Sequence, residues 1–163
     1  MQFVYNTESI IDDVPSIFLA GPTPRSAAVA SWRKKALPLL ESAVDFDGAF
    51  VLPEDRGFVA RPDFEYAGQI EWERTHLASA NVVLFWIPRD LKDMPAFTTN
   101  IEFGFVSERN QHYVLGFPKD AAKMRYLEYI ANKQSMPIVH DLEQAINISI
   151  ELCSNHQRMR PKV

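Results

Sequence analysis

The segment from Asn81 to Ile87, almost entirely apolar, places the tightest limit on how this chain can fold. It has the length of one strand and lacks the alternation of polar and apolar residues that a half-exposed strand shows. Such a strand belongs in the centre of a parallel sheet that is covered on both faces. Pro88 ends the segment, so the following residues leave the carboxyl end of a central strand. Open α/β sheets bind their ligands at that edge.

The rest of the chain alternates short apolar runs with amphipathic patterns, which predicts βαβ units. We expect a single domain over residues 1–163 with a flavodoxin-like or Rossmann-like doubly wound α/β fold and a mainly parallel five-stranded sheet. The expected strands are 16–20, 49–52, 81–87, 113–117 and 137–139. The expected helices are 27–42, 64–80, 100–109, 120–133 and one from 141, with Asp63, Asp120 and Asp141 as N-caps of three of them.

The first expected helix has an apolar side and a polar side. Trp32, Ala36 and Leu40 share the apolar side, and we place Arg33 away from it. This is the pattern of a helix that packs one face on a sheet.

Charge and composition exclude several classes of function. The net charge of −4 gives no electrostatic footprint for duplex nucleic acid or an anionic membrane, so we expect a small-molecule substrate. No apolar run approaches the roughly 18 residues of a membrane span. Cys153, the single cysteine, cannot form an internal disulfide, and the N-terminus shows no charged-then-apolar leader, so we expect a cytoplasmic protein.

The segment from Thr98 to Gly104 follows the central strand and carries one carboxylate, Glu102. Two interpretations are open. Glu102 can be the N3 residue of a capping box whose N-cap is Thr99. Alternatively, it is a catalytic group beside the ligand crevice. Gly104 favours the second interpretation, because a glycine inside a helix costs about 1 kcal/mol relative to alanine and so calls for close approach of a ligand or a strand.

A second acidic cluster contains Glu71 and Glu73. In a helix these two side chains point in different directions, so only one can face the crevice. Each of them can instead belong to a helix face that is exposed to solvent. Glu73 and His76 have the Glu-x-x-His spacing of di-metal bundles, but such sites use the motif twice and it occurs once, so we expect no metal. The turn 21–24 lacks the glycine patterns that bind dinucleotides or nucleoside triphosphates, and we expect no cofactor.

Three segments together resemble the nucleoside 2-deoxyribosyltransferase superfamily, and more narrowly its phage and bacterial branch. They are Ile17 to Pro24, Glu71 to Glu73 with Leu77 to Pro88, and Thr98 to Gly104. The resemblance implies a doubly wound α/β fold, a homo-oligomer (a dimer or larger), and exchange of the base of a 2'-deoxynucleoside with a free nucleobase, without a cofactor.

The resemblance also implies roles for individual residues. Glu102 becomes the nucleophile that attacks the anomeric carbon, and Glu73 becomes the acidic helix residue near the base and sugar, where the family has an aspartate. The family's aspartate and glycine-threonine step before the nucleophile are replaced here, so the acid that protonates the base stays open; Asp93 is a candidate if its loop folds back. The expected substrate contacts are Gly21, Pro22, Thr23 and Pro24 around the base, together with Glu71, Trp86, Thr98, Thr99 and Asn100.

The chemistry suits a carboxylate at this position. Breaking an N-glycosidic bond develops positive charge on the sugar, which a carboxylate stabilises or captures as an ester. We expect the helix N-terminus to lower the pKa of Glu102 and keep it ionised.

Two other functions remain open. One is a nucleoside or nucleotide N-glycoside hydrolase on the same scaffold, with Lys123 or Arg125 reaching a 5'-phosphate near the start of a helix. The other is a non-catalytic nucleotide-binding module, which would not need Glu102.

Overall fold

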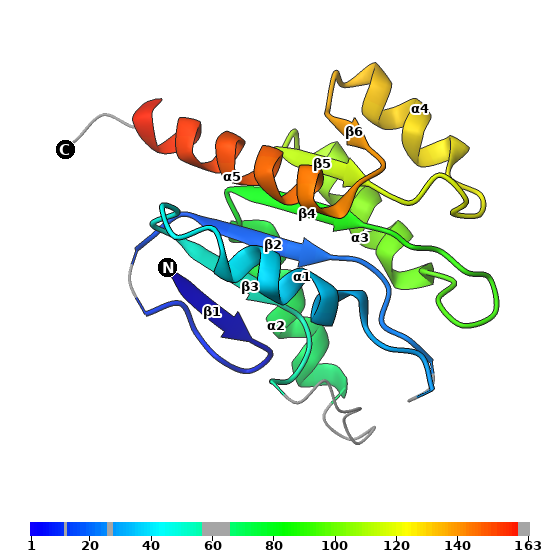
Figure 1. The fold of residues 1–163 in the computed structure, drawn as a ribbon, viewed down its shortest axis with the longest axis horizontal. Helices are drawn as coiled ribbons and strands as arrows, with labels where there is room; N and C mark the ends of the chain where they lie inside the picture. Colours follow the sequence, from blue (N-terminus) through cyan, green and yellow to red (C-terminus); the bar gives the residue numbers. More distant parts are fainter. Residues whose placement is uncertain (12, 26–27, 57–65, 160–163) are drawn as a thin grey trace.

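The computed structural model describes residues 1–11, 13–25, 28–56 and 66–159, which form a sheet with helices on both faces (Figure 1). All five strand pairings in this described part are parallel, so the predicted α/β class is confirmed. The strands are β1 (Gln2–Tyr5), β2 (Ser16–Ala20), β3 (Ala49–Leu52), β4 (Val82–Trp86), β5 (Tyr113–Gly116) and β6 (Ile138–Val139). The helices are α1 (Trp32–Glu41), α2 (Tyr66–Ser79), α3 (Phe97–Glu108), α4 (Arg125–Lys133) and α5 (Leu142–Met159).

The strand order is β1-β3-β2-β4-β5-β6. Without the edge strand β1 this is the flavodoxin-like order. From β2 the chain moves to β3 on one side and then crosses to β4 on the other side of β2. Strands β2 and β4 are neighbours, with Ala20 opposite Phe85. The order therefore reverses between β2 and β4, and ligands of such sheets bind outside the carboxyl ends of the strands at that point.

The sequence-based prediction of five strands is wrong by one. The missed strand, β1, pairs with β3 at the edge of the sheet. It has four residues, and Gln2 and Phe3 are only partly buried. Although Val4 and Tyr5 are buried, a run of four residues is too short for its pattern to identify a strand in the sequence.

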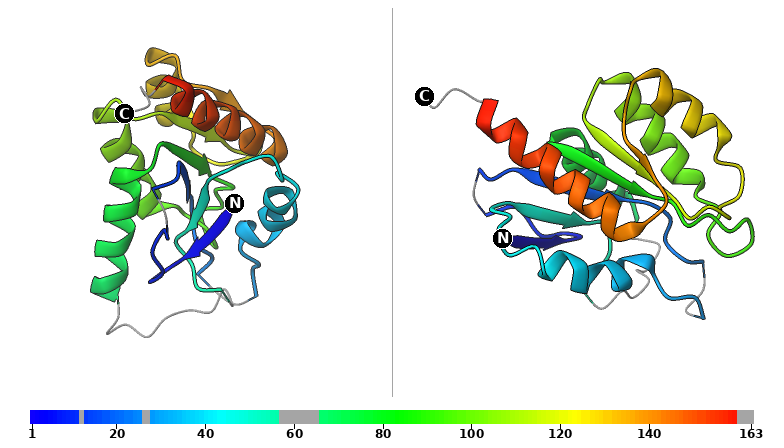
Figure 2. Two further views of the ribbon diagram at one scale, coloured as in Figure 1. Left: turned by 90° about the vertical axis from the view of Figure 1, so that its left-hand side faces the viewer. Right: turned by 45° about the horizontal axis from the view of Figure 1, so that its top comes forward.

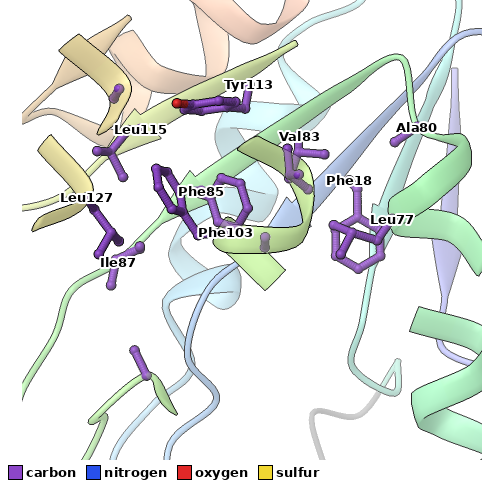
Figure 3. Close-up of a cluster of buried hydrophobic side chains, with 14 of the residues drawn as sticks. Phe18, Leu77, Ala80, Val83, Phe85, Ile87, Phe103, Tyr113, Leu115 and Leu127 are labelled. Carbon is purple, nitrogen blue, oxygen red and sulfur yellow. The ribbon is translucent and has the colours of Figure 1, made fainter. Parts of the chain in front are cut away.

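The two faces of the sheet have separate apolar clusters. The left view of Figure 2 shows helices on both sides of the sheet. Helices α2, α3 and α4 pack on one face, and α1 and α5 pack on the other. On the first face, Phe103 of α3 lies edge-on to Phe85 and Tyr113, with ring centroids 5.3 and 5.2 Å apart (Figure 3). Burying an aromatic ring of this size stabilises the fold by about 1.5 to 3 kcal/mol, which fixes α3 firmly over β4 and β5.

Three helix boundaries differ from the prediction. Helix α1 begins at Trp32, because the Ser31 hydroxyl accepts a hydrogen bond from the Arg33 amide and caps it. Helix α3 begins at Phe97, earlier than expected. Helix α4 begins at Arg125 after Met124, so Asp120 is not its N-cap.

The N-cap predicted for the last helix is confirmed, since Asp141 accepts a hydrogen bond from the amide of Gln144 at 2.9 Å. Asp63 lies outside the described residues. Within the described ranges, no helix has the length and apolar character needed to cross a membrane.

Candidate active site

Glu102 lies in the second turn of α3, on the helix that leaves the carboxyl end of β4. The residue that precedes this helix is Ala96, whose backbone is left-handed (φ 60°) and which makes no side-chain capping hydrogen bond. Thr99 is an interior helical residue and 1% exposed. The capping-box interpretation of Thr99 and Glu102 is therefore wrong, and the position of Glu102 needs another explanation.

The carboxyl of Glu102 is partly buried, and its pKa is raised from 4.5 to about 7. Burial is the largest cause of this rise, the negative charge of Glu73 adds to it, and the positive charge of Arg33 opposes it. The expectation that the helix N-terminus lowers this pKa is wrong. The helix dipole acts most strongly in the first turn of a helix. Because α3 begins at Phe97, Glu102 lies beyond that turn.

Glu73 belongs to α2, on the same face of the sheet as α3. Burial raises its pKa, while a hydrogen bond from the side-chain amide of Gln69 (2.8 Å) and the charge of Arg33 act in the opposite direction. Glu71 is exposed to solvent, as its position two residues earlier on the helix requires. The structure therefore pairs Glu102 with Glu73 and not with Glu71.

Arg33 lies on α1, which covers the other face of the sheet, and its side chain is 1% exposed. Its Nε and Nη2 atoms donate to the carbonyl of Leu19 at 3.1 and 2.9 Å, and Nη2 also donates to the carbonyl of Gly21 at 2.9 Å. The prediction that Arg33 lies away from the buried side is wrong. Residues 33, 36 and 40 have the i, i+3, i+7 spacing of one helix face, a signal that the polarity of arginine hid.

The turn after β2 touches the end of β4. A Cβ atom added to Gly21 would lie 2.2 Å from the carbonyl oxygen of Trp86, so the two strands approach too closely here for any larger residue. The ring of Trp86 packs within the apolar cluster on the α1 and α5 face and is covered by core residues. Of the other predicted base contacts, Pro22 is buried and Thr23 is exposed, with Pro24 between them in exposure.

The loop between β4 and α3 folds back on itself through an antiparallel bridge between Asp90 and Met94. The carbonyl of Asp93 accepts a hydrogen bond from the amide of Arg25 at 3.1 Å, and the Arg25 guanidinium lies over the ring of Phe97. The loops after β2 and β4 are thus joined above the switch point. The charges that act on Glu102 are those of Glu73 and Arg33, and Asp93 is not among them.

Arg89 is a site-forming residue that the sequence interpretation missed. It lies three residues beyond the end of β4 and is 7% exposed. Its Nη2 atom donates to the side-chain oxygen of Asn100, and its Nη1 atom donates to the carbonyl of Lys123 at 3.0 Å. Its position one residue after the proline that ends the central strand was the available signal. It fixes the first turn of α3 against the loop before α4.

Two of the predicted contacts on α3 are exposed, and one is not. Thr98 and Asn100 are exposed, whereas the hydroxyl of Thr99 is buried without a hydrogen-bond partner among the described residues. A Cβ at Gly104 would meet no described atom within 4 Å, so contact with a neighbouring strand does not explain this glycine. Approach of a ligand to Gly104 stays a prediction.

A cavity of about 410 Å³ lies beside the start of α4, at the carboxyl ends of β5 and β6. It is lined by Phe117, Lys119, Ala121, Lys123, Met124, Arg125, Glu128 and His140. Three of these side chains are cationic and one is a carboxylate, which suits an anionic group. In the part of the chain that the structure covers, no three His, Cys, Asp or Glu side chains gather as metal ligands would.

The fold and the acidic pair define an α/β protein with two carboxyl groups at the switch point of a flavodoxin-like sheet. Residues 14–121 match the family model described as nucleoside 2-deoxyribosyltransferase like, so the chain belongs to that family. The matched range includes Gly21, Glu73 and Glu102. A search of curated proteins found no match. The family indicates a transferase-like enzyme of nucleotide metabolism that acts on small-molecule nucleosides.

Proposed function

We propose that this protein breaks the N-glycosidic bond of a 2'-deoxynucleoside and transfers the sugar to a second free base through an ester with Glu102. The observation that carries the proposal is the partly buried Glu73–Glu102 pair, whose charges interact at the switch point. Cleavage of a glycosidic bond with retention uses two neighbouring carboxyl groups, one ionised as the nucleophile and one protonated as the acid.

In the proposed reaction, the ionised Glu102 oxygen bonds to the anomeric carbon as the bond from that carbon to the base nitrogen breaks. The bonding electrons leave with the base, which takes up a proton. We assign Glu73, in preference to Asp93, as the donor of that proton, because burial raises the pKa of Glu73 and so favours its protonated form. The reverse steps with the second base release the new nucleoside and regenerate the carboxylate.

The remaining assignments follow the positions of the loops. The turn 21–24 lies at the switch point and takes the base, and the exposed residues Thr98 and Asn100 lie near the nucleophile on α3 and contact the sugar. Arg89 orients Asn100 for this contact. We also propose that the protein is a cytoplasmic homo-oligomer, a dimer or larger. It uses no cofactor or metal, and it binds neither duplex nucleic acid nor membrane.

The test incubates the protein with a deoxynucleoside and a second free base and resolves the products by chromatography. Transfer gives a new nucleoside, and hydrolysis gives free sugar. Glu102→Gln is expected to abolish either product, whereas Glu71→Gln, at an exposed position on α2, serves as the matched control. Unchanged turnover in Glu102→Gln would remove the nucleophile assignment, and binding without any product would favour a non-catalytic module.

The cavity beside α4 supports one second candidate, hydrolysis of a nucleotide. Lys123 and Arg125 line it, and Arg89 connects the Lys123 carbonyl to Asn100 on the helix of the nucleophile. If these side chains hold a 5'-phosphate, deoxynucleoside monophosphates are cleaved faster than deoxynucleosides. Lys123→Ala and Arg125→Ala then remove that preference and leave the rate with deoxynucleosides unchanged.

A further inference from the structure

One guanidinium, that of Arg33, acts on three carboxyl groups from three parts of the fold. Its Nη1 atom lies 3.6 Å from a carboxylate oxygen of Glu54, which follows β3 and is 7% exposed. The positive charge of Arg33 also acts on Glu73 of α2 and Glu102 of α3. The carbonyls of Leu19 and Gly21 hold the Arg33 guanidinium at the carboxyl end of β2, where the strand order reverses and where its charge acts on both members of the acidic pair.

The hydrogen bonds of Arg33 fix its position without cancelling its charge. Nε and Nη2 donate to the backbone carbonyls of Leu19 and Gly21, which carry no net charge. Nη1 makes no hydrogen bond within the described residues. The ion pair with Glu54 is longer than a hydrogen bond, and the Ser31 hydroxyl donates to the other Glu54 oxygen at 2.7 Å. Part of the positive charge therefore remains available to the acidic pair.

Stability alone is a poor reason for this arrangement. Replacing a buried ion pair by well-packed apolar residues is often neutral or stabilising, because the charges no longer lose their hydration. The carbonyls of Leu19 and Gly21, at and just beyond the end of β2, hold this buried arginine at the switch point of the sheet. The effect of its charge on neighbouring groups is therefore a better explanation.

We propose that Arg33 is a positioning residue of the active site, which keeps negative charge on the Glu73–Glu102 pair and is itself tuned by Glu54. This inference rests on the proposed function of that pair. Without Arg33, its positive charge no longer opposes the negative charge of Glu73, and the protonated, non-nucleophilic form of Glu102 gains population. Without the Glu54 charge, Arg33 acts on the pair more strongly and the ionised form gains population.

The test compares Arg33→Met and Glu54→Gln, which are expected to act in opposite directions. The acid limb of the kcat/KM profile moves up by about one pH unit in Arg33→Met and moves down in Glu54→Gln. A shift of one unit corresponds to about a tenfold lower kcat/KM at a fixed pH below the limb. Arg33→Lys, which keeps the charge, restores most of the original limb. Lys35→Met removes an exposed charge from the same helix and leaves the limb unchanged.

A direct titration separates this inference from the proposed function. Carbon-13 NMR of the Glu102 carboxyl, assigned with Glu102→Gln, reports its ionisation whether or not the protein turns over a nucleoside. Opposite shifts in Arg33→Met and Glu54→Gln support the role of Arg33 even if no base exchange occurs. If Arg33→Met does not fold, Glu54→Gln alone tests the inference: a lower pKa of Glu102 in that variant supports it. Shifts of the same sign, or none, would overturn the inference while leaving exchange activity intact.

Discussion

Burial raises the pKa of Glu102 on α3, and the negative charge of Glu73 on α2 acts in the same direction. The two glutamates belong to two helices on the same face of the sheet, α2 before β4 in the chain and α3 after it. At neutral pH the Glu102 carboxyl is divided between its acid and its carboxylate, because its pKa is about 7. Its reactivity should therefore respond to small changes in pH and in nearby charge.

We expect kcat/KM for base exchange to fall as the pH drops through about 7. The nucleophile must be ionised, and burial keeps the proton on Glu102 up to that pH. Initial rates at low substrate concentration between pH 5 and 9 measure this limb. An acid limb near 4.5, the ordinary value for a glutamate, would show that burial does not control the reacting group.

Glu73→Gln should move this acid limb to lower pH. Removing the negative charge of Glu73 lowers the pKa of Glu102, because that charge disfavours the ionised form. The maximal rate should fall as well, since Glu73 is the proposed acid. Glu71→Gln removes a charge two residues away on an exposed part of α2 and should leave the limb in place. Equal shifts in both variants would mean that only net charge matters.

Glu102→Gln should stabilise the protein at alkaline pH. The folded state holds the Glu102 proton more tightly than the unfolded state, so this group contributes stability that is complete below about pH 4.5 and lost as the pH rises through about 7. The loss is on the order of 3 kcal/mol. Glutamine is neutral throughout, so the gain should be present at pH 8 and small at pH 4.5. Chemical denaturation at both pH values measures it, and a gain independent of pH would contradict the assignment.

Gly21→Ala should destabilise the fold or prevent it. The added methyl group would lie 2.2 Å from the Trp86 carbonyl, and the backbone φ of 153° is also unfavourable for alanine. Overpacking of this kind costs about 1 to 3 kcal/mol or more. Gly68→Ala on α2 is the control, because its methyl group meets no described atom within 4 Å and should stabilise the helix slightly. Thermal melting of the two variants checks the contrast.

Gly104→Ala tests whether a ligand approaches α3. With nothing described within 4 Å of the added methyl group, alanine should stabilise the helix by about 0.5 to 1 kcal/mol. If the sugar or base lies against this turn, KM should rise despite the gain in stability. A stabilised variant with unchanged KM would place the substrate elsewhere along the crevice.

The class of fold could be predicted from the sequence because it depends on local composition. The apolar run before Pro88 and the alternation of strand and helix patterns require a covered parallel sheet. The same local signals placed Glu102 after the central strand and Glu73 on the preceding helix. They did not find β1, whose four residues are too few to show a strand pattern.

The electrostatics of the candidate site were decided by tertiary structure alone. Which of Glu71 and Glu73 faces Glu102, and whether Glu102 is readily ionised, depend on burial and on charges brought from other elements. The sequence predicts that Arg33 faces solvent, yet its side chain is buried and bonded to the carbonyls of Leu19 and Gly21 at the carboxyl end of β2. Hydrophobic patterning is written along the chain, whereas a pKa is set by the groups that folding places around a side chain and by the water that it removes.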